Sequence, residues 1–135
     1  MVLLALAIVV CAGLYLLGLG LTVFVARQAV TDFLQLFASS ARAHYLEMST
    51  RLVVGGAFIL AAPQMHGTLV FLGFGWILVV TTIPLLVLPW RWHHRLAQRI
   101  VPPFLGLLPL VGLCSMIAGA AILGCIDWGQ ALSRL

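Results

Sequence analysis

The chain has 135 residues, of which 64% are hydrophobic and only 7% are charged. A soluble domain carries about 25% charged residues, so this composition excludes a soluble enzyme, a nucleic-acid-binding domain and a disordered tail. The net charge of +4 comes from arginine alone, because the chain has no lysine. The absence of both lysine and asparagine, whose codons are A-rich, suggests a GC-rich bacterial genome.

The first predicted element is a membrane span over residues 2–26. Residues 1–26 contain no charged side chain, and a helix of about 20 apolar residues crosses the hydrocarbon core of a bilayer. No charged region precedes this apolar stretch, as a cleavable signal peptide would require. We therefore expect the segment to remain as a spanning helix.

The next segment, residues 27–50, has the pattern of an amphipathic helix. Apolar residues recur at spacings of three and four: Val30, Phe33, Phe37, Ala41 and Tyr45. Such a pattern predicts a helix that lies in the inner membrane interface, with Thr31 and Asp32 as its N-terminal cap. The alternative is a packed cytoplasmic extension of the second span.

A tight hairpin is predicted in the middle of the next uncharged stretch, residues 52–90, which is too long for a single span. Pro63 interrupts a helical ladder and Gly67 allows a sharp turn. The second and third spans are therefore placed at residues 46–63 and 68–89. The alternative is a re-entrant hairpin that does not cross the bilayer.

The second span is long enough to cross only if it includes two charged residues. Glu47 and Arg51 are four positions apart with the glutamate first, which is the favourable order for an ion pair on a helix. Because both charges are costly at depth, we expect them to pair at the inner end of this span, with Arg51 extending toward the headgroups.

The segment between the third and fourth spans is the most distinctive part of the chain. It combines arginines spaced by four with tryptophans, and the residues expected to contact lipid headgroups are Arg91, Trp92, Arg95 and Arg99. Tryptophan is enriched at membrane interfaces, and arginines beside a membrane attract anionic lipids. We therefore expect this segment to bind the anionic inner leaflet.

The fourth predicted span, residues 103–126, is rich in small side chains. Gly112, Ser115 and Gly119 fall on one helix face. Small residues let membrane helices approach closely where lipid supplies no hydrophobic drive. This face is therefore predicted to pack against another helix, either within the chain or in a second copy.

Arginine placement predicts the orientation in the membrane. Arg27, Arg42 and Arg51 lie in or beside the segment that joins the first two spans, and three more arginines lie within residues 90–103. Only Arg134 lies near a terminus. The positive-inside rule then places both arginine-bearing segments in the cytoplasm, and both termini and the hairpin on the outer side.

No pattern of catalytic, cofactor-binding or metal-binding residues is visible. The cysteines are separated in apolar stretches and form no CxxC pair: Cys11, Cys114 and Cys125. The histidines are His44, His66, His93 and His94. A membrane haem needs two imidazoles that face each other at one depth, and the predicted topology does not provide them. We therefore expect no cofactor and no metal.

The sequence predicts an all-α integral membrane protein with four transmembrane helices in one small bundle. The expected function is that of a non-enzymatic inner-membrane protein, an accessory or assembly partner of a larger membrane complex. One alternative is a transporter or channel for ions or small solutes, formed by several copies. Another is a membrane enzyme with a cytoplasmic-face site that uses His44, Glu47 and the arginine cluster. The expected partners are the bilayer, its anionic headgroups, and either further copies or a larger complex, without nucleic acid.

Overall fold

The structure is a computed structural model, and it describes residues 1–37, 40–87 and 105–132. Its elements, in chain order, are α1 (Val2–Val25), α2 (Arg27–Phe37), α3 (Ala41–Ala61), the 3-10 turn η1 (Ala62–Gln64), α4 (Thr68–Val87), the 3-10 turn η2 (Leu105–Leu107), α6 (Leu108–Gly124) and α7 (Trp128–Leu132). No strand occurs within these three ranges. The predicted all-α class is therefore confirmed for the described residues.

Three helices are long and apolar enough to cross a membrane: α1, α3 with its continuation into η1, and α4. These helices expose many large apolar side chains, as expected for a protein surrounded by lipid. The fourth apolar helix, α6, has 17 residues and is about 26 Å long at 1.5 Å per residue. A fourth crossing therefore stays a prediction, and residues 103–104 lie outside the described ranges.

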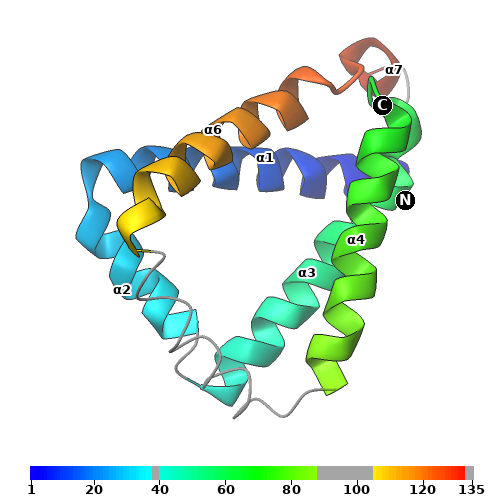
Figure 1. The fold of residues 1–135 in the computed structure, drawn as a ribbon. Helices are drawn as coiled ribbons and strands as arrows, with labels where there is room; N and C mark the ends of the chain where they lie inside the picture. The colour runs from blue at the N-terminus through cyan, green and yellow to red at the C-terminus, as the bar shows by residue number, and fades with distance from the viewer. Residues whose placement is uncertain (38–39, 88–104, 133–135) are drawn as a thin grey trace.

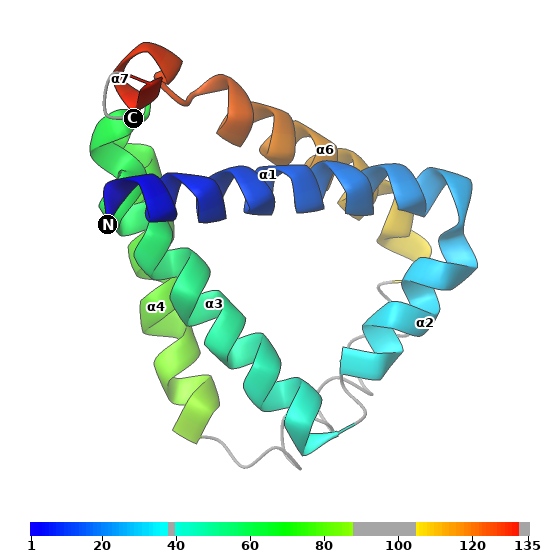
Figure 2. The ribbon, with the colours of Figure 1, turned by 180° about the vertical axis from the view of Figure 1, so that it is seen from behind.

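The helices form two antiparallel pairs that diverge from one corner of the molecule (Figures 1 and 2). In one pair α1 lies beside α6, and in the other α3 lies beside α4. The N-terminus, the turn between α3 and α4, and the C-terminal helix α7 all lie at the shared corner. The arrangement differs from the compact bundle that the sequence suggested, because the two pairs separate with distance from this corner.

The shared corner holds the largest apolar core. Its most buried side chains come from α1, α3, α6 and the residues just after α6, and they include Val9, Phe58, Ala61, Ile122 and Ile126. These residues are contributed by segments that are far apart in the sequence. The two helix pairs are therefore joined by packing near the corner.

Backbone hydrogen bonds also join the α3–α4 turn to the end of α6. The His66 amide donates to the Cys125 carbonyl at 2.6 Å, and the Asp127 amide donates to the Gln64 carbonyl at 2.9 Å. Gly67 completes the turn with a positive φ of 84°, a conformation that favours glycine. The turn and the C-terminal region are therefore held together at the same end of the molecule.

The expected bounds of the amphipathic helix, residues 27–50, are wrong, because the chain forms two helices there. The first of them, α2, lies between the first two apolar helices, and its place at the membrane interface stays a prediction. Ser40 is extended, with φ of −148° and ψ of 158°, and its Oγ accepts a hydrogen bond from the Ala43 amide at 3.2 Å. This N-cap makes α3 begin at Ala41, five residues before the expected start near Leu46. An earlier start is what the alternative of an extended second span predicts. The expected cap at Thr31 is also wrong, because Thr31 lies within α2.

Candidate binding cleft

Glycines allow α1 and α6 to pack with their backbones in close contact. A Cβ atom added at Gly119 would lie 2.6 Å from the Gly13 carbonyl oxygen, and one added at Gly112 would lie 2.9 Å from Cβ of Val23. Ser115, the third member of the expected packing face, is half-buried. Gly112 and Gly119 of α6 therefore face α1 of the same chain.

The α3–α4 pair combines a glycine contact with aromatic packing. A Cβ atom added at Gly75 would lie 2.8 Å from the Gly55 carbonyl oxygen. The Phe58 ring is stacked with that of Phe71 at a centroid distance of 6.1 Å, and it meets Phe74 edge to face at 5.1 Å. This packing brings the two helices together along the half nearer the corner.

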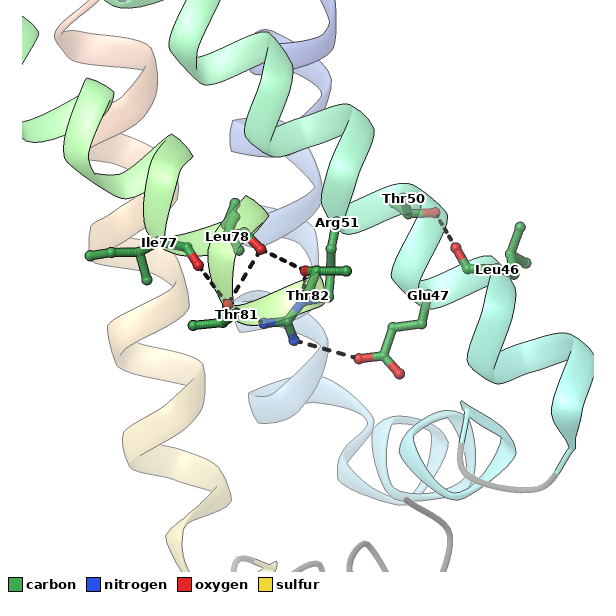
Figure 3. Close-up of polar contacts among 8 residues, drawn as sticks. All are labelled: Leu46, Glu47, Thr50, Arg51, Ile77, Leu78, Thr81 and Thr82. Atoms are coloured by element: carbon green, nitrogen blue, oxygen red, sulfur yellow. Dashed lines mark hydrogen bonds and ion pairs between the residues drawn. The ribbon is translucent and has the colours of Figure 1, made fainter. Parts of the chain in front are cut away.

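Farther from the corner, Arg51 joins α3 to α4 through polar contacts (Figure 3). Its Nε donates to Thr82 Oγ1 at 3.3 Å, and its Nη2 donates to Thr81 Oγ1 at 3.5 Å. Its Nη1 lies 3.8 Å from Glu47 Oε1. Glu47 and Arg51 are thus adjacent, one helical turn apart, while their expected position at a membrane interface stays a prediction.

The two threonines are held in place by the backbone of α4. Thr82 Oγ1 donates to the Leu78 carbonyl at 2.6 Å, and Thr81 Oγ1 donates to the Ile77 carbonyl at 2.6 Å (Figure 3). Thr82 is fully buried, whereas Thr81 is exposed. The buried Thr82 hydroxyl therefore donates one hydrogen bond within α4 and accepts another from Arg51, so both its donor and its acceptor have partners.

A lateral cleft of about 680 Å³ lies between α1 and the α3–α4 pair, and Phe33 of α2 also contributes to its wall. At its polar end, far from the corner, are Glu47, Thr50 and Arg51. At its apolar end, toward the corner, are Ile8, Phe58, Phe74 and Ile122. The floor along α1 includes Cys11, Ala12 and Tyr15. This ordering of polar and apolar side chains matches the shape of an amphiphilic molecule.

The structure does not bring the histidines that it describes into this cleft. His44 is only 2% exposed and meets the Tyr45 ring edge to face at 5.3 Å, and it is not among the lining residues. His66 belongs to the α3–α4 turn. The expected headgroup contacts, Arg91, Trp92, Arg95 and Arg99, lie outside the described residues, as does His93. Within the described ranges, no three histidine, cysteine or acidic side chains are grouped as a metal site would require.

Sequence reasoning missed the link between Arg51 and the two threonines. Thr82 is 31 positions away from Arg51, and nothing in their spacing indicates a contact. The available signal was chemical. An arginine in an apolar helix needs hydrogen-bond acceptors, and Thr81 and Thr82 supply hydroxyl oxygens from the facing helix.

Comparison of the chain with protein-family models, with curated proteins and with solved structures gives no match.

Proposed function

We propose that this is a non-enzymatic multi-pass membrane protein that binds an amphiphilic molecule within the bilayer. The observation that carries the proposal is the lateral cleft, whose described lining is mainly apolar, with Glu47, Thr50 and Arg51 at one end. Ligand sites are concave and mainly apolar, with a few polar groups that fix orientation. In this proposal the protein acts as an accessory subunit of a larger membrane complex.

Binding accounts for the cleft better than catalysis does. The enzyme alternative requires His44 to lie beside Glu47 and Arg51 in one site. His44, the nearest candidate in the sequence, packs against Tyr45 and is absent from the lining of the cleft. The polar end therefore offers charge recognition by Glu47 and Arg51, which is what a binding site requires.

The proposed location is the bacterial cytoplasmic membrane, with four crossings and both termini outside. The support is the arginine distribution in the sequence, together with a fold in which the N-terminus, the α3–α4 turn and α7 share one end (Figures 1 and 2). In this orientation α2 lies at the inner surface. Arg91, Trp92, Arg95 and Arg99 then contact anionic headgroups.

Reporter fusions test this orientation directly. Fusions after Leu135 should be active only with an outer-side reporter, and fusions within residues 91–99 only with a cytoplasmic one. Replacing Arg91, Arg95 and Arg99 together with glutamine should reduce the fidelity of this orientation. A C-terminal fusion that is active only in the cytoplasm would overturn the proposed topology.

Photo-crosslinking tests binding in the cleft. A fatty acid with a diazirine in its chain is added to the purified protein in detergent, and the labelled peptides are mapped by mass spectrometry. We expect labelling of the α1 peptide around Cys11, and we expect Ala7→Trp, which adds bulk to the wall, to reduce it. Ala120→Trp, on an exposed position of α6 outside the cleft, is the matched control. Equal labelling in both variants would contradict the proposal.

A second candidate function is transport of ions or small solutes by several copies of the chain. The observation that favours it is the chain of polar contacts from Glu47 through Arg51 to Thr82, which borders the lateral cleft. Transport requires that copies associate and that solute moves. Flux in proteoliposomes that is lost in Arg51→Gln, together with an oligomer in detergent, would favour transport over binding alone.

A further inference from the structure

The Glu47 carboxylate has little hydrogen bonding in the part of the chain that the structure describes. Its one polar contact there is the 3.8 Å approach to Nη1 of Arg51, which is too long for a hydrogen bond. Its side chain is 28% exposed and forms part of the cleft wall. An ionised carboxylate in an apolar environment is costly unless it is paired and hydrogen-bonded. The polar end of the cleft can therefore accept a hydrogen-bond donor.

Arg51 can donate hydrogen bonds to a ligand in the same end of the cleft. Its Nε and Nη2 groups are directed to the threonines of α4, whereas Nη1 is the atom nearest to Glu47. The side chain is 34% exposed and lines the cleft. A guanidinium has five N–H donors and binds phosphate well. The cleft therefore presents a cation and an anion next to each other, and the matching ligand group carries both charges.

The rest of the cleft fits an acyl chain. Phe58 and Phe74 line the apolar end, and Phe58 lies about 10 Å along α3 from Arg51 at 1.5 Å per residue. Phe33 of α2 and Glu47 of α3 both line the cleft. In the proposed orientation α2 lies at the inner surface, and this would put the polar end of the cleft near the level of the lipid headgroups.

We propose that the lateral cleft binds a phospholipid whose headgroup carries a phosphate and a primary ammonium, namely phosphatidylethanolamine. The ammonium donates hydrogen bonds to Glu47, the phosphate accepts them from Arg51, and one acyl chain lies against Phe58 and Phe74. Such charge-assisted hydrogen bonds are stronger than neutral ones. The inference rests on the proposed function, since it names the headgroup of the amphiphile bound in the cleft.

Native mass spectrometry of the full chain, released from mixed micelles, tests this headgroup preference. The micelles contain equal amounts of phosphatidylethanolamine, phosphatidylcholine and phosphatidylglycerol with identical acyl chains. Phosphatidylcholine lacks N–H donors and phosphatidylglycerol lacks a cation. We expect the protein to retain phosphatidylethanolamine about tenfold better than either, the discrimination that one charge-assisted hydrogen bond supplies.

Variants assign the preference to the two charged groups. Glu47→Gln should abolish the discrimination between phosphatidylethanolamine and phosphatidylcholine, because it removes the anion that binds the ammonium. Arg51→Gln should lower retention of all three phospholipids, because it removes the cation that binds the phosphate. If this variant does not fold, Arg51→Lys replaces it; lysine keeps the positive charge but lacks the planar guanidinium, so retention should fall less. Arg42→Gln is the matched control, because Arg42 is exposed at the start of α3 and outside the cleft lining.

Two results would overturn the headgroup assignment. One is equal retention of the three lipids by the unaltered protein, and the other is a preference for phosphatidylglycerol, which would mean that Arg51 alone recognises the head. If diazirine labelling around Cys11 persists in either case, the cleft still binds an amphiphile and only the assigned head is wrong. If the labelling is absent as well, the proposed function fails together with the assignment.

Discussion

The two helix pairs are held together by different kinds of contact. α1 and α6 meet through Gly13, Gly112 and Gly119, with backbone atoms of one helix against the glycines of the other. α3 and α4 share one glycine contact and add stacked phenylalanines and the hydrogen bond from Arg51 to Thr82. In lipid, helix association depends on close packing and interhelical hydrogen bonds. The hydrophobic effect does not drive the helices together there, because the lipid tails are as apolar as the helix surfaces.

The two pairs differ in the contacts that remain when close packing is lost. The α1–α6 contact has no polar link among the described side chains of the two helices, and the two helices are distant in sequence. The α3–α4 contact is supported by the short turn at η1 as well as by Arg51. Loss of close packing should therefore separate α1 from α6 more readily than α3 from α4.

The largest effect is expected for Gly119→Leu in α6. The new side chain would start 2.6 Å from the Gly13 carbonyl oxygen, so the backbones must move apart. We expect the free energy of unfolding to fall by about 3 kcal/mol, the upper range for overpacking, as measured by denaturant titration in detergent. Gly124→Leu is the control, since nothing lies within 4 Å of a Cβ atom there. Equal stability of the two variants would refute close packing at Gly119.

A smaller loss is expected for Gly75→Leu in α4. Its Cβ atom would lie 2.8 Å from the Gly55 carbonyl oxygen, but the turn and Arg51 still join the two helices. We expect a loss of about 2 kcal/mol in the same titration. Gly73→Leu, where a Cβ atom meets open space, should change little. A loss larger than that of Gly119→Leu would show that α3 and α4 depend on close packing more than α1 and α6 do.

Thr82→Val tests the polar contribution to the α3–α4 pair. Valine keeps the shape of the side chain but removes the oxygen that accepts from Arg51 Nε. We expect a loss of about 1 kcal/mol, within the range measured for interhelical hydrogen bonds in membranes. Thr81→Val is the control, because Thr81 is exposed and its contact with Arg51 is the longer one, 3.5 Å. If both variants lose the same stability, the buried position of Thr82 has no special role.

The smallest effect is expected at the shared corner. Asp127 Oδ1 accepts a hydrogen bond from the Gln130 amide at 3.1 Å and so caps α7. Asp127→Ala should destabilise this helix by about 0.5 kcal/mol, seen as faster amide hydrogen exchange in residues 128–131. Exchange in α1 and α4 should stay unchanged. Faster exchange throughout the chain would mean that the corner supports both helix pairs and not α7 alone.

The sequence alone indicated several local features. The high apolar content and the uncharged stretches indicated membrane-crossing helices, because a helix without charged side chains has no solvated face to present to water. Pro63 and Gly67 indicated the turn between α3 and α4, since one stops a helical ladder and the other permits a positive φ. The spacing of Glu47 and Arg51 indicated their adjacency on one helix. Each of these inferences depends on residues close together in the chain.

The tertiary structure decided what lies between helices. When every face of a helix is apolar, periodicity does not reveal which face meets a neighbour, so the sequence could not choose α1 as the partner of Gly112 and Gly119. It also could not foresee the break at Ser40, because local capping there overrides the apolar periodicity that continues through residues 27–50. The contact between Arg51 and Thr82 arises only when α3 and α4 pack side by side. The lateral cleft needs α1 as well, because helices distant in sequence supply its walls.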